Sequence, residues 1–327
     1  MRRRDFIQGI TASVASPLVA HAQRAAVPVI GFLNGGTADS IPTALAGFRR
    51  GLKVAGFTEN ENVTIEFRWA DNQFERLPSL AADLVHRQVA VILSSGGAAS
   101  GLAAKAATST IPIVLAFGSD PVKLGLVDSL SSPGGNITGV TFLTTELVGK
   151  RLELLCQMVP QATKIAYLRT GAQQSTVVTE QMTTDFLATA GALGRQVLVL
   201  QVDSEREFDS AFAKLVDQKA DSLVIASHPL FDTDKIPALT LRYRVPAIYQ
   251  RREFVEAGGL MSYGASFADA FRLAAIYVGQ ILKGTKPADL PIQQSAKLDM
   301  VINLRTAKTL GLTVPMILQM TADDVVE

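Results

Sequence analysis

The sequence predicts an α/β protein of two lobes, each a parallel sheet flanked by helices, joined by short hinge segments. Three observations support this prediction. Short apolar runs rich in β-branched residues alternate with helical segments, which is the order of right-handed βαβ units. The same order of elements restarts near residue 164, so it occurs twice along the chain. The length of 327 residues is sufficient for two domains, at roughly 150 residues per domain.

The first half contains five apolar runs that we expect to be strands. Helical segments follow the first three, with apolar residues spaced three or four apart. The expected strands are 27–33, 63–67, 89–93, 111–117 and 137–142, and the helices cover about 41–52, 77–85 and the residues from 98 onward.

The third of these strands leads into the stretch that organises this half. Residues 89–93 read V-A-V-I-L, and Ser94, Ser95, Gly96 and Gly97 follow before an alanine-rich helix begins at Ala98. A strand, a tight turn of small residues and a helix N-terminus leave backbone N–H groups pointing into open space. The stretch predicts a site for a carboxylate or a phosphate, with an ordinary strand-to-helix turn as the alternative.

The second half repeats this arrangement. Its expected strands are 164–168, 196–202, 221–226, 245–249, 260–263 and 298–302. Its main helices cover 147–159, a segment after 176 that ends at about 193, 208–218, 267–282 and 305–310. The run 221–226 has the place in this half that 89–93 has in the first. We expect lobe 1 to comprise 27–143 plus about 264–285, and lobe 2 to comprise 144–263 plus about 286–327. Hinges are expected near 142–146, 259–263 and 286–292.

Residues 1–22 have the features of an export signal. Three arginines, Arg2 to Arg4, precede a short apolar stretch and the small-residue site Ala20-His21-Ala22. The order of arginines, aspartate and phenylalanine fits a twin-arginine signal, although the general secretory route stays open. Cleavage after about Ala22 would release the protein into the periplasm. No later stretch approaches the roughly 20 apolar residues of a membrane-spanning helix, so we expect no membrane insertion.

Charge and cysteine content exclude several classes of function. Removing residues 1–22 takes away three arginines and one aspartate and leaves 28 basic and 29 acidic residues, a nearly neutral chain. Such a chain offers no electrostatic basis for binding nucleic acid. Cys156 is the only cysteine, so there is neither an intramolecular disulfide nor a thiolate metal cluster.

Motifs for catalysis or cofactor binding are absent from the sequence. It contains no G-x-x-x-x-G-K-[ST] loop, no G-x-G-x-x-G and no G-x-S-x-G nucleophile elbow. After the signal only His86 and His228 remain, without the spacing of metal ligands. We therefore expect no metal, no cofactor and no enzymatic activity.

Small and polar residues gather instead at the carboxyl ends of the expected strands. In parallel α/β sheets ligands bind in the crevice outside these ends, and two facing lobes would share one cleft. Donors without a base–nucleophile pair favour binding over turnover. The candidate ligand-binding residues are Asn34, Gly35, Ser94, Ser95, Gly96, Gly97, Ser119, Asp120, Thr170, Ser175, Ser227, His228 and Tyr263.

Four of the polar and aromatic residues have alternative interpretations. Asp120 could bind an amine or a hydroxyl, but aspartate before proline also forms turns. Tyr263 could cover an apolar group of the ligand. His228 could contact the ligand or serve local structure. Arg251 is interpreted as the solvated start of a helix rather than an anion clamp.

Longer strings of the sequence carry a family resemblance. They are G-F-R-R-G-L at Gly47, V-T-I-E-F-R-W-A at Val63, I-P-I-V-L-A-F-G-S-D-P-V at Ile111, G-L-V-D-S-L-S-S-P-G-G-N-I-T-G-V at Gly125, R-E-F-V-E-A-G-G-L-M-S-Y-G at Arg252 and V-I-N-L-R-T-A-K-T-L-G-L at Val301. Together they closely resemble the ABC-transporter substrate-binding family whose characterised relatives bind tryptophan and other aromatic or hydrophobic amino acids.

The resemblance implies a type I periplasmic-binding-protein fold, a cleft that closes on a solute, and delivery of that solute to a membrane permease with a cytoplasmic ATPase. In relatives the turn at Ser94–Gly97 often reads G-T-P-A, whereas this chain has S-G-G-A. The hydroxyl that threonine would supply must then come from Ser94 or Ser95, so the identity of the ligand does not transfer.

The sequence thus predicts a periplasmic receptor of an ABC importer that captures an amino acid-like or aromatic carboxylate solute. Ser94, Ser95 and the N–H groups of Gly97 and Ala98 would hold the carboxylate. The expected partners are the small-molecule solute and an ABC permease, with no nucleic acid, and the protein is expected to be a monomer. A sensory module that presents its closed form to a signalling receptor is the alternative, and an enzyme on the same fold is a third possibility.

Overall fold

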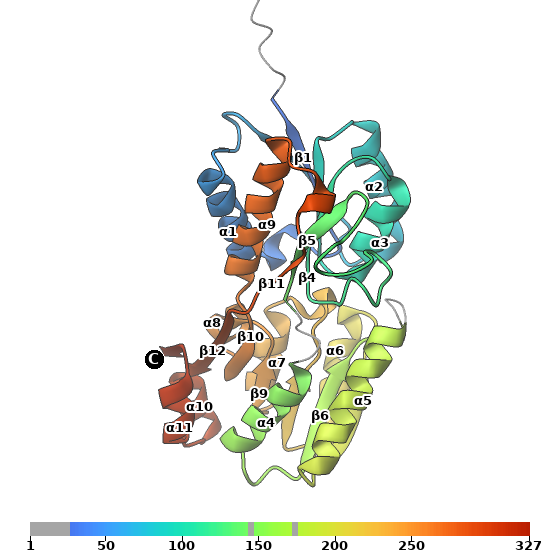
Figure 1. The fold of residues 1–327 in the computed structure, drawn as a ribbon. Coiled ribbons are helices and arrows are strands. Elements are labelled where there is room, and N and C mark those ends of the chain that lie inside the picture. Colours follow the sequence, from blue (N-terminus) through green and yellow to red (C-terminus); the bar gives the residue numbers. More distant parts are fainter. Residues whose placement is uncertain (1–26, 143–146, 172–175) are drawn as a thin grey trace, which may run out of the picture.

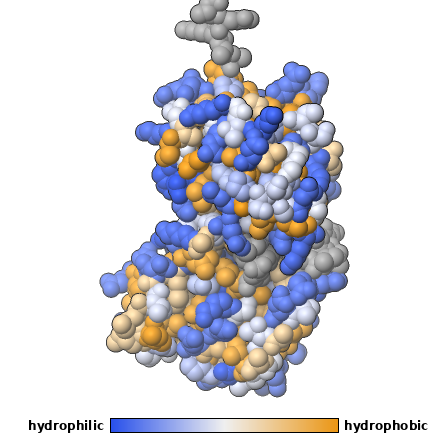
Figure 2. All heavy atoms as spheres, viewed as in Figure 1, coloured by the Kyte–Doolittle hydropathy of each residue, from blue (hydrophilic) through white to orange (hydrophobic). Residues whose placement is uncertain are grey.

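The computed structural model describes residues 27–142, 147–171 and 176–327. They form two α/β lobes, one above the other in Figure 1. The molecule narrows where the lobes meet, and hydrophilic and hydrophobic residues are interspersed over the face seen in Figure 2. Among the described residues, no helix combines the length and apolar character needed to cross a membrane. The expected signal at 1–22 and the candidate Ser175 lie outside the described residues.

The first lobe contains a six-stranded parallel sheet in the order β11-β5-β4-β3-β1-β2. Helices α1 and α9 pack together on one side of it, and α2 and α3 pack together on the other (Figure 1). The strands are β1 Val29–Asn34, β2 Thr64–Trp69, β3 Val91–Ser95, β4 Ile113–Phe117, β5 Ile137–Thr141 and β11 Gln293–Gln294. The helices are α1 Pro42–Val54, α2 Leu77–His86, α3 Ala98–Ala107 and α9 Phe267–Leu282, with short 3-10 turns η1 Ala38–Ser40, η2 Phe74–Arg76 and η6 Pro287–Asp289.

The second lobe contains a seven-stranded sheet in the order β13-β12-β10-β9-β8-β6-β7, in which only the described pair β10–β12 is antiparallel. Its strands are β6 Lys164–Arg169, β7 Gln196–Gln201, β8 Ser222–Ile225, β9 Ala247–Tyr249, β10 Met261–Ala265, β12 Leu298–Asn303 and β13 Asp324–Val326. Its helices are α4 Val148–Met158, α5 Thr176–Ala192, α6 Phe208–Asp217, α7 Lys235–Arg242, α8 Arg252–Glu256, α10 Leu304–Leu310 and α11 Met316–Thr321, with η4 Glu205–Glu207 and η5 Pro229–Phe231.

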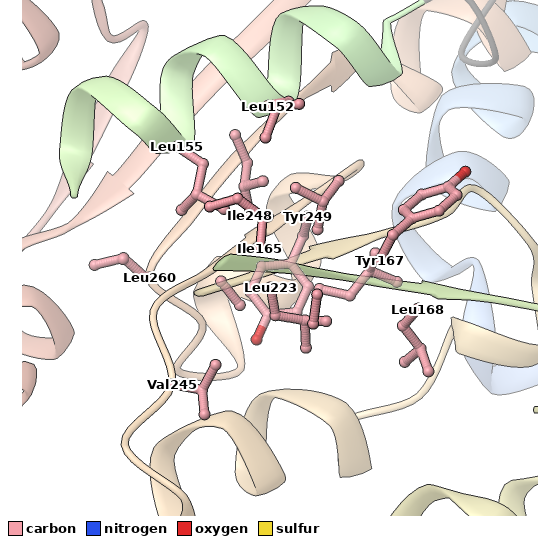
Figure 3. Packing of buried hydrophobic residues seen from close by; sticks show 14 of the residues in the cluster. Leu152, Leu155, Ile165, Tyr167, Leu168, Leu223, Val245, Ile248, Tyr249 and Leu260 are labelled. Atoms are coloured by element: carbon pink, nitrogen blue, oxygen red, sulfur yellow. The ribbon is translucent and has the colours of Figure 1, made fainter. Parts of the chain in front are cut away.

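Each lobe has its own hydrophobic core, and the two buried clusters share no residue. In the second lobe Leu152 and Leu155 of α4 face Ile165 of β6 and Ile248 of β9 (Figure 3). Separate cores mean that each lobe can move as a unit relative to the other.

Two passages between the lobes differ from the expected hinges, and the hinge expected at 142–146 lies largely outside the described residues. Strand β10 stays in the second sheet through Ala265, and α9 of the first lobe begins two residues later. The expected lobe boundary at residue 286 is wrong, because Leu290 and Ile292 are buried in the first core and Thr138 Oγ1 donates to the Leu290 carbonyl at 2.7 Å. The chain returns to the second lobe only at residues 295–297. Only Leu290 and Ile292 anchor this segment in the first core, and they form no periodic apolar pattern. The sequence therefore does not indicate the lobe to which the segment belongs.

Candidate functional site

A cavity lies between the lobes at the carboxyl ends of their parallel strands. It measures about 670 Å³, including the part open to solvent, which is within the range of small-molecule sites. Its walls come from the loops after β1, β3, β4 and β5, the start of α9, and the loops after β8 and β9. The lining residues are Asn34, Gly36, Ser40, Ile41, Gly96, Gly97, Ala116, Phe117, Gly118, Ser119, Phe142, Ser227, His228, Asp232, Gln250, Phe267 and Phe271.

The turn between β3 and α3 presents its backbone to the cavity. Gly96 and Gly97 have φ angles of 73° and 105°, a region that favours glycine. A Cβ at Gly96 would lie 2.5 Å from Asn34 Oδ1, so a larger residue has no room there. Gly97 is the N-cap of α3 and has no side chain to cap it, so the first N–H groups of this helix are available to an anion.

The serines before this turn are structural rather than ligand-facing. Ser94 and Ser95 are fully buried at the end of β3. Ser94 Oγ donates to Ser100 Oγ at 3.1 Å, and Ser95 Oγ accepts from Asn34 Nδ2 at 2.8 Å. The expected hydroxyl contacts with a carboxylate are therefore not available, because both serines still lie within the sheet and bond to neighbouring segments.

Aromatic rings form the cavity wall near the passages between the lobes. Phe142 comes directly after β5, and Phe267 is the first residue of α9; their ring centroids lie 4.8 Å apart. The ring centroid of Phe271 lies 6.4 Å from that of Phe267. Phe117 at the end of β4 and Ile41 before α1 complete this wall. It is suited to an apolar group of the size of an aromatic side chain.

The second lobe contributes a buried ion pair, which the sequence interpretation missed. Arg251 Nη2 lies 2.9 Å from Asp232 Oδ1, and the two side chains are 3% and 12% exposed. Gln250 Nε2 donates to the same carboxylate oxygen at 3.4 Å. The expectation that Arg251 is solvated is wrong, because this side chain also crosses to the first lobe, donating from Nη1 to the Ser40 carbonyl at 3.0 Å and lying 5.1 Å from the Phe267 ring centre.

Asp232 and Gln250 both line the cavity, and each can accept a further hydrogen bond there. Gln250 Oε1 is buried and has no hydrogen-bond partner among the described residues. Burial raises the pKa of Asp232 to about 6, and the neighbouring Arg251 guanidinium opposes that rise. A carboxylate destabilised by desolvation gains most from a further cation or donor.

His228 stands between the lobes as a neutral ring. Its Nδ1 accepts a hydrogen bond from the Leu230 amide at 3.1 Å, which leaves the proton on Nε2. Its ring meets the edge of Phe74 from the first lobe at 5.6 Å. Burial lowers the pKa of His228 to about 4, so this side chain is uncharged near neutral pH. His228 therefore both stabilises the backbone at Leu230 and lines the cavity.

The remaining candidates divide between the cavity and its surroundings. Ser119 and Ser227 line the cavity, and Thr170 lines a smaller pocket beside it. Asp120 Oδ1 accepts from the amides of Val122 and Lys123 at 2.9 and 3.2 Å, so the turn-forming alternative is the one observed. Tyr263 packs on the second core, opposite Met300 in the β10–β12 pair, rather than on the cavity. Gly35 does not line the cavity itself but lies against the Gly96 backbone.

The cavity residues that the sequence analysis missed also lie at the carboxyl ends of expected strands. Gln250 and Arg251 come directly after the strand expected at 245–249, and Phe117 ends the strand expected at 111–117. Applying the carboxyl-end rule to long side chains as well as small ones would have included them. Among the described residues, no group of three His, Cys, Asp or Glu side chains could hold a metal ion.

Two parallel α/β lobes that enclose one cavity between their strand ends define a two-lobed solute-binding protein with the type I periplasmic-binding fold. The chain belongs to the ABC transporter substrate binding protein family, whose sequence pattern matches residues 26–326. This is a family of substrate-binding proteins rather than of enzymes, and such proteins are extracellular or periplasmic.

One named protein is similar to this chain in sequence, and two solved structures are similar to it in fold. A tyrosine-binding protein of Clostridioides difficile is 25% identical over 279 residues, which are 84% of this chain and 78% of that protein. A conserved domain protein from Vibrio cholerae superposes with a TM-score of 0.82 at 22% identity, covering 91% of this chain and 99% of that one. An ABC domain from Streptococcus pneumoniae in complex with L-Trp superposes with a TM-score of 0.80 at 24% identity, with the same coverage.

Proposed function

We propose that this protein captures an amino acid with an aromatic or large apolar side chain and presents it to an ABC permease for import. One observation supports this most strongly. Three kinds of wall meet in one cavity, namely free helix N–H groups, a carboxylate beside an unpartnered amide oxygen, and a cluster of phenylalanine rings. These walls complement the carboxylate, the ammonium and the side chain of one amino acid.

The carboxylate of the solute would bind at the N-terminus of α3. Gly97, the N-cap of α3, lines the cavity, and the helix dipole adds a partial positive charge at this end of the helix. A charge-assisted hydrogen bond of this kind contributes roughly 1.5–3 kcal/mol. The backbone thus replaces the serine hydroxyls that the sequence suggested.

The ammonium of the solute would bind between Asp232 and Gln250 on the opposite lobe. Gln250 Oε1 lacks a donor, and Asp232 is only partly compensated by Arg251. A buried acceptor without a donor costs about 1–3 kcal/mol, which a bound ammonium would recover. An ammonium held here and a carboxylate held at α3 connect the two lobes through the ligand.

The side chain of the solute would lie against Phe117, Phe142, Phe267 and Phe271. An aromatic side chain buries about 150–250 Å². At about 25 cal/mol per Å² this burial contributes at most about 4–6 kcal/mol, a large part of the ~8 kcal/mol of micromolar affinity. Aromatic and large aliphatic side chains should therefore bind better than small ones.

The same contacts explain how binding would favour the closed arrangement. Arg251 already links Asp232 of the second lobe to the Ser40 carbonyl of the first. A solute that touches α3 and Asp232 adds contacts present only when the lobes are close, so it shifts the population toward closure. A permease can recognise that closed form. The tyrosine-binding relative and the L-Trp complex support an amino acid as the solute class.

We further propose that the chain is exported to the periplasm, that the signal ends at about Ala22, and that the mature protein is monomeric. Isothermal titration calorimetry with the mature protein tests the binding proposal. The ligands are the amino acids, aromatic acids without an amino group, sugars and purines. Aromatic amino acids should bind most tightly and alanine weakly. Binding of sugars or purines alone would contradict the proposal.

A further inference from the structure

A second, smaller pocket lies between the lobes beside the main cavity. Its empty volume is about 330 Å³, and we call it the β2–β6 pocket after two of the strands whose ends it adjoins. His228 lines both this pocket and the main cavity, so the two spaces are neighbours. The lining residues are Asn72, Phe74, Thr170, Gly171, Asp203, His228 and Leu230.

The loop after β2 holds Asn72 rigidly at this pocket. The amide of Asn72 donates to the Gly35 carbonyl at 3.0 Å, and the amide of Asp71 donates to the Gly36 carbonyl at 3.1 Å. Both residues have positive φ angles, 54° for Asp71 and 62° for Asn72, a conformation that Asn and Asp tolerate better than most residues. The loop is therefore fixed to the same β1 loop that borders the main cavity.

Asn72 presents an unused acceptor. Its Oδ1 is buried and has no hydrogen-bond partner among the described residues. Buried polar atoms are nearly always paired in folded proteins, and an exception needs an explanation. A group that donates a hydrogen bond would satisfy this atom.

The other residues of the pocket favour the same kind of group. Asp203 is the only charged side chain among the described lining residues, and its Oδ1 accepts from the Gly171 amide at 2.6 Å. The neutral ring of His228, whose Nδ1 accepts from Leu230, adds no positive charge. Thr170 offers a hydroxyl that can donate or accept. Acceptors and one negative charge therefore predominate, which disfavours an anion or a purely apolar group.

We propose that the β2–β6 pocket is a specificity subsite that binds a hydrogen-bond-donating hydroxyl or amino group carried by the solute of the main cavity. Asn72 Oδ1 accepts the hydrogen bond, and Asp203 supplies a negative field. The inference rests on the proposed binding of an aromatic solute in the main cavity. It narrows the solute class to aromatic acids or aromatic amino acids whose side chain carries a hydroxyl or amino group, and it disfavours phenylalanine, which has neither.

Matched ligand pairs that differ by one donor test this subsite by titration calorimetry. The pairs are 3-phenylpropionate with 3-(4-hydroxyphenyl)propionate, L-phenylalanine with L-tyrosine, and L-phenylalanine with 4-amino-L-phenylalanine. In the wild-type protein the donor-bearing member should bind about tenfold more tightly, as expected for filling a buried unpaired acceptor. Equal affinity within every pair would overturn the subsite.

Three variants assign the effect to Asn72. Asn72→Gly keeps the positive φ and removes the acceptor, so the tenfold preference should disappear while donor-free ligands bind as before. Asn72→Asp keeps an acceptor and adds a charge, so 4-amino-L-phenylalanine should gain relative to L-tyrosine. Asp71→Gly is the control, since Asp71 has the same backbone conformation but does not line the pocket. A preference that survives Asn72→Gly contradicts the assignment.

The ligand set separates this inference from the proposed function. If the propionates show the donor preference but the amino acids do not bind, the amino acid assignment fails and the subsite stands. If amino acids bind without any donor preference, the subsite fails and the proposed function stands. If no aromatic compound of the set binds, both are refuted.

Discussion

The two lobes contribute different chemistry to the cavity although they share one architecture. The first lobe presents backbone N–H groups after Gly97 and a wall of phenylalanine rings. The second lobe presents the side chains of Asp232, Gln250 and His228. In the proposed function the first lobe would define the shape of the cavity and bind the carboxylate of the solute, and the second lobe would supply the charge that pairs with its ammonium.

The difference comes from the residues that succeed the equivalent strands β3 and β8. Small residues after β3 allow the backbone itself to approach a ligand, because Gly96 and Gly97 have no side chains. The segments after β8 and β9 carry long polar residues that are held by one another, as in the Asp232–Arg251 pair. A side-chain charge is removed by a conservative substitution, whereas a backbone donor is removed only by proline or displaced by a change at a neighbouring glycine, so variants can test the lobes separately.

Asp232→Asn should have the largest effect. It removes the proposed ammonium partner and leaves the Arg251 charge without its ion pair. Losing one partner of a buried pair costs about 3 kcal/mol of stability, and the affinity for aromatic amino acids should fall on the order of 100-fold. Urea unfolding and calorimetry measure the two effects. Asp234→Asn, an exposed acid two residues away, should change neither; an unchanged affinity in Asp232→Asn would refute the ammonium site.

Gly96→Ala should disrupt the first-lobe side of the site. A Cβ at Gly96 would collide with Asn34 Oδ1 and the Gly35 amide, both at 2.5 Å. Gly125→Ala is the matched control, because Gly125 also has a positive φ, 64°, but nothing lies within 4 Å of its added Cβ. The control measures backbone strain alone, about 1 kcal/mol. Gly96→Ala should lose about 2 kcal/mol more and should weaken ligand binding. Equal losses would mean that the loop can move aside.

The pH dependence of binding should reflect the second lobe. The pKa of Asp232 is raised by burial to about 6, above its ordinary value, so its proton competes with the solute ammonium below that pH. Affinity should be constant above pH 7 and should fall as pH decreases, by about tenfold at pH 5. His228 does not titrate in this range, since its pKa is near 4. The fall should vanish in Asp232→Asn.

The same raised pKa has a separate effect on stability. The folded protein binds the Asp232 proton more tightly than the unfolded chain does. The contribution of this group to stability is therefore greatest below pH 4 and decreases as pH rises to about 6. Unfolding of wild type and Asp232→Asn across this pH range measures it.

Phe142→Leu should have the smallest effect of the three variants. It removes one ring from the apolar wall, and with it the contact with Phe267 at 4.8 Å. Aromatic amino acids should bind about fivefold more weakly, equivalent to about 1 kcal/mol, while leucine should be affected less. Phe186→Leu is the control, because that ring stacks on Tyr167 inside the second lobe. It should lower stability without changing affinity.

The positions of the strand ends could be predicted from the sequence more accurately than the contacts of the side chains at those ends. The turn after β3 and most strands with their parallel order could be predicted from short apolar runs and small-residue turns, but the antiparallel β10–β12 pair and the short strands β11 and β13 were not predicted. Ser94 and Ser95 were assigned to the ligand, but the structure turns their hydroxyls to Ser100 and Asn34. A strand end fixes where a residue lies along the sheet and leaves open which neighbour its side chain meets.

The sequence by itself determined the two-lobed α/β architecture and the glycine turn at α3. Both depend on local patterns, namely apolar periodicity and residues without side chains. Only the tertiary structure decided that Arg251 is buried, that segment 286–295 belongs to the first lobe, and that Asp232 lines the same cavity as Gly97. These features depend on contacts between residues far apart in the chain, such as Arg251 with Ser40, which no local pattern encodes.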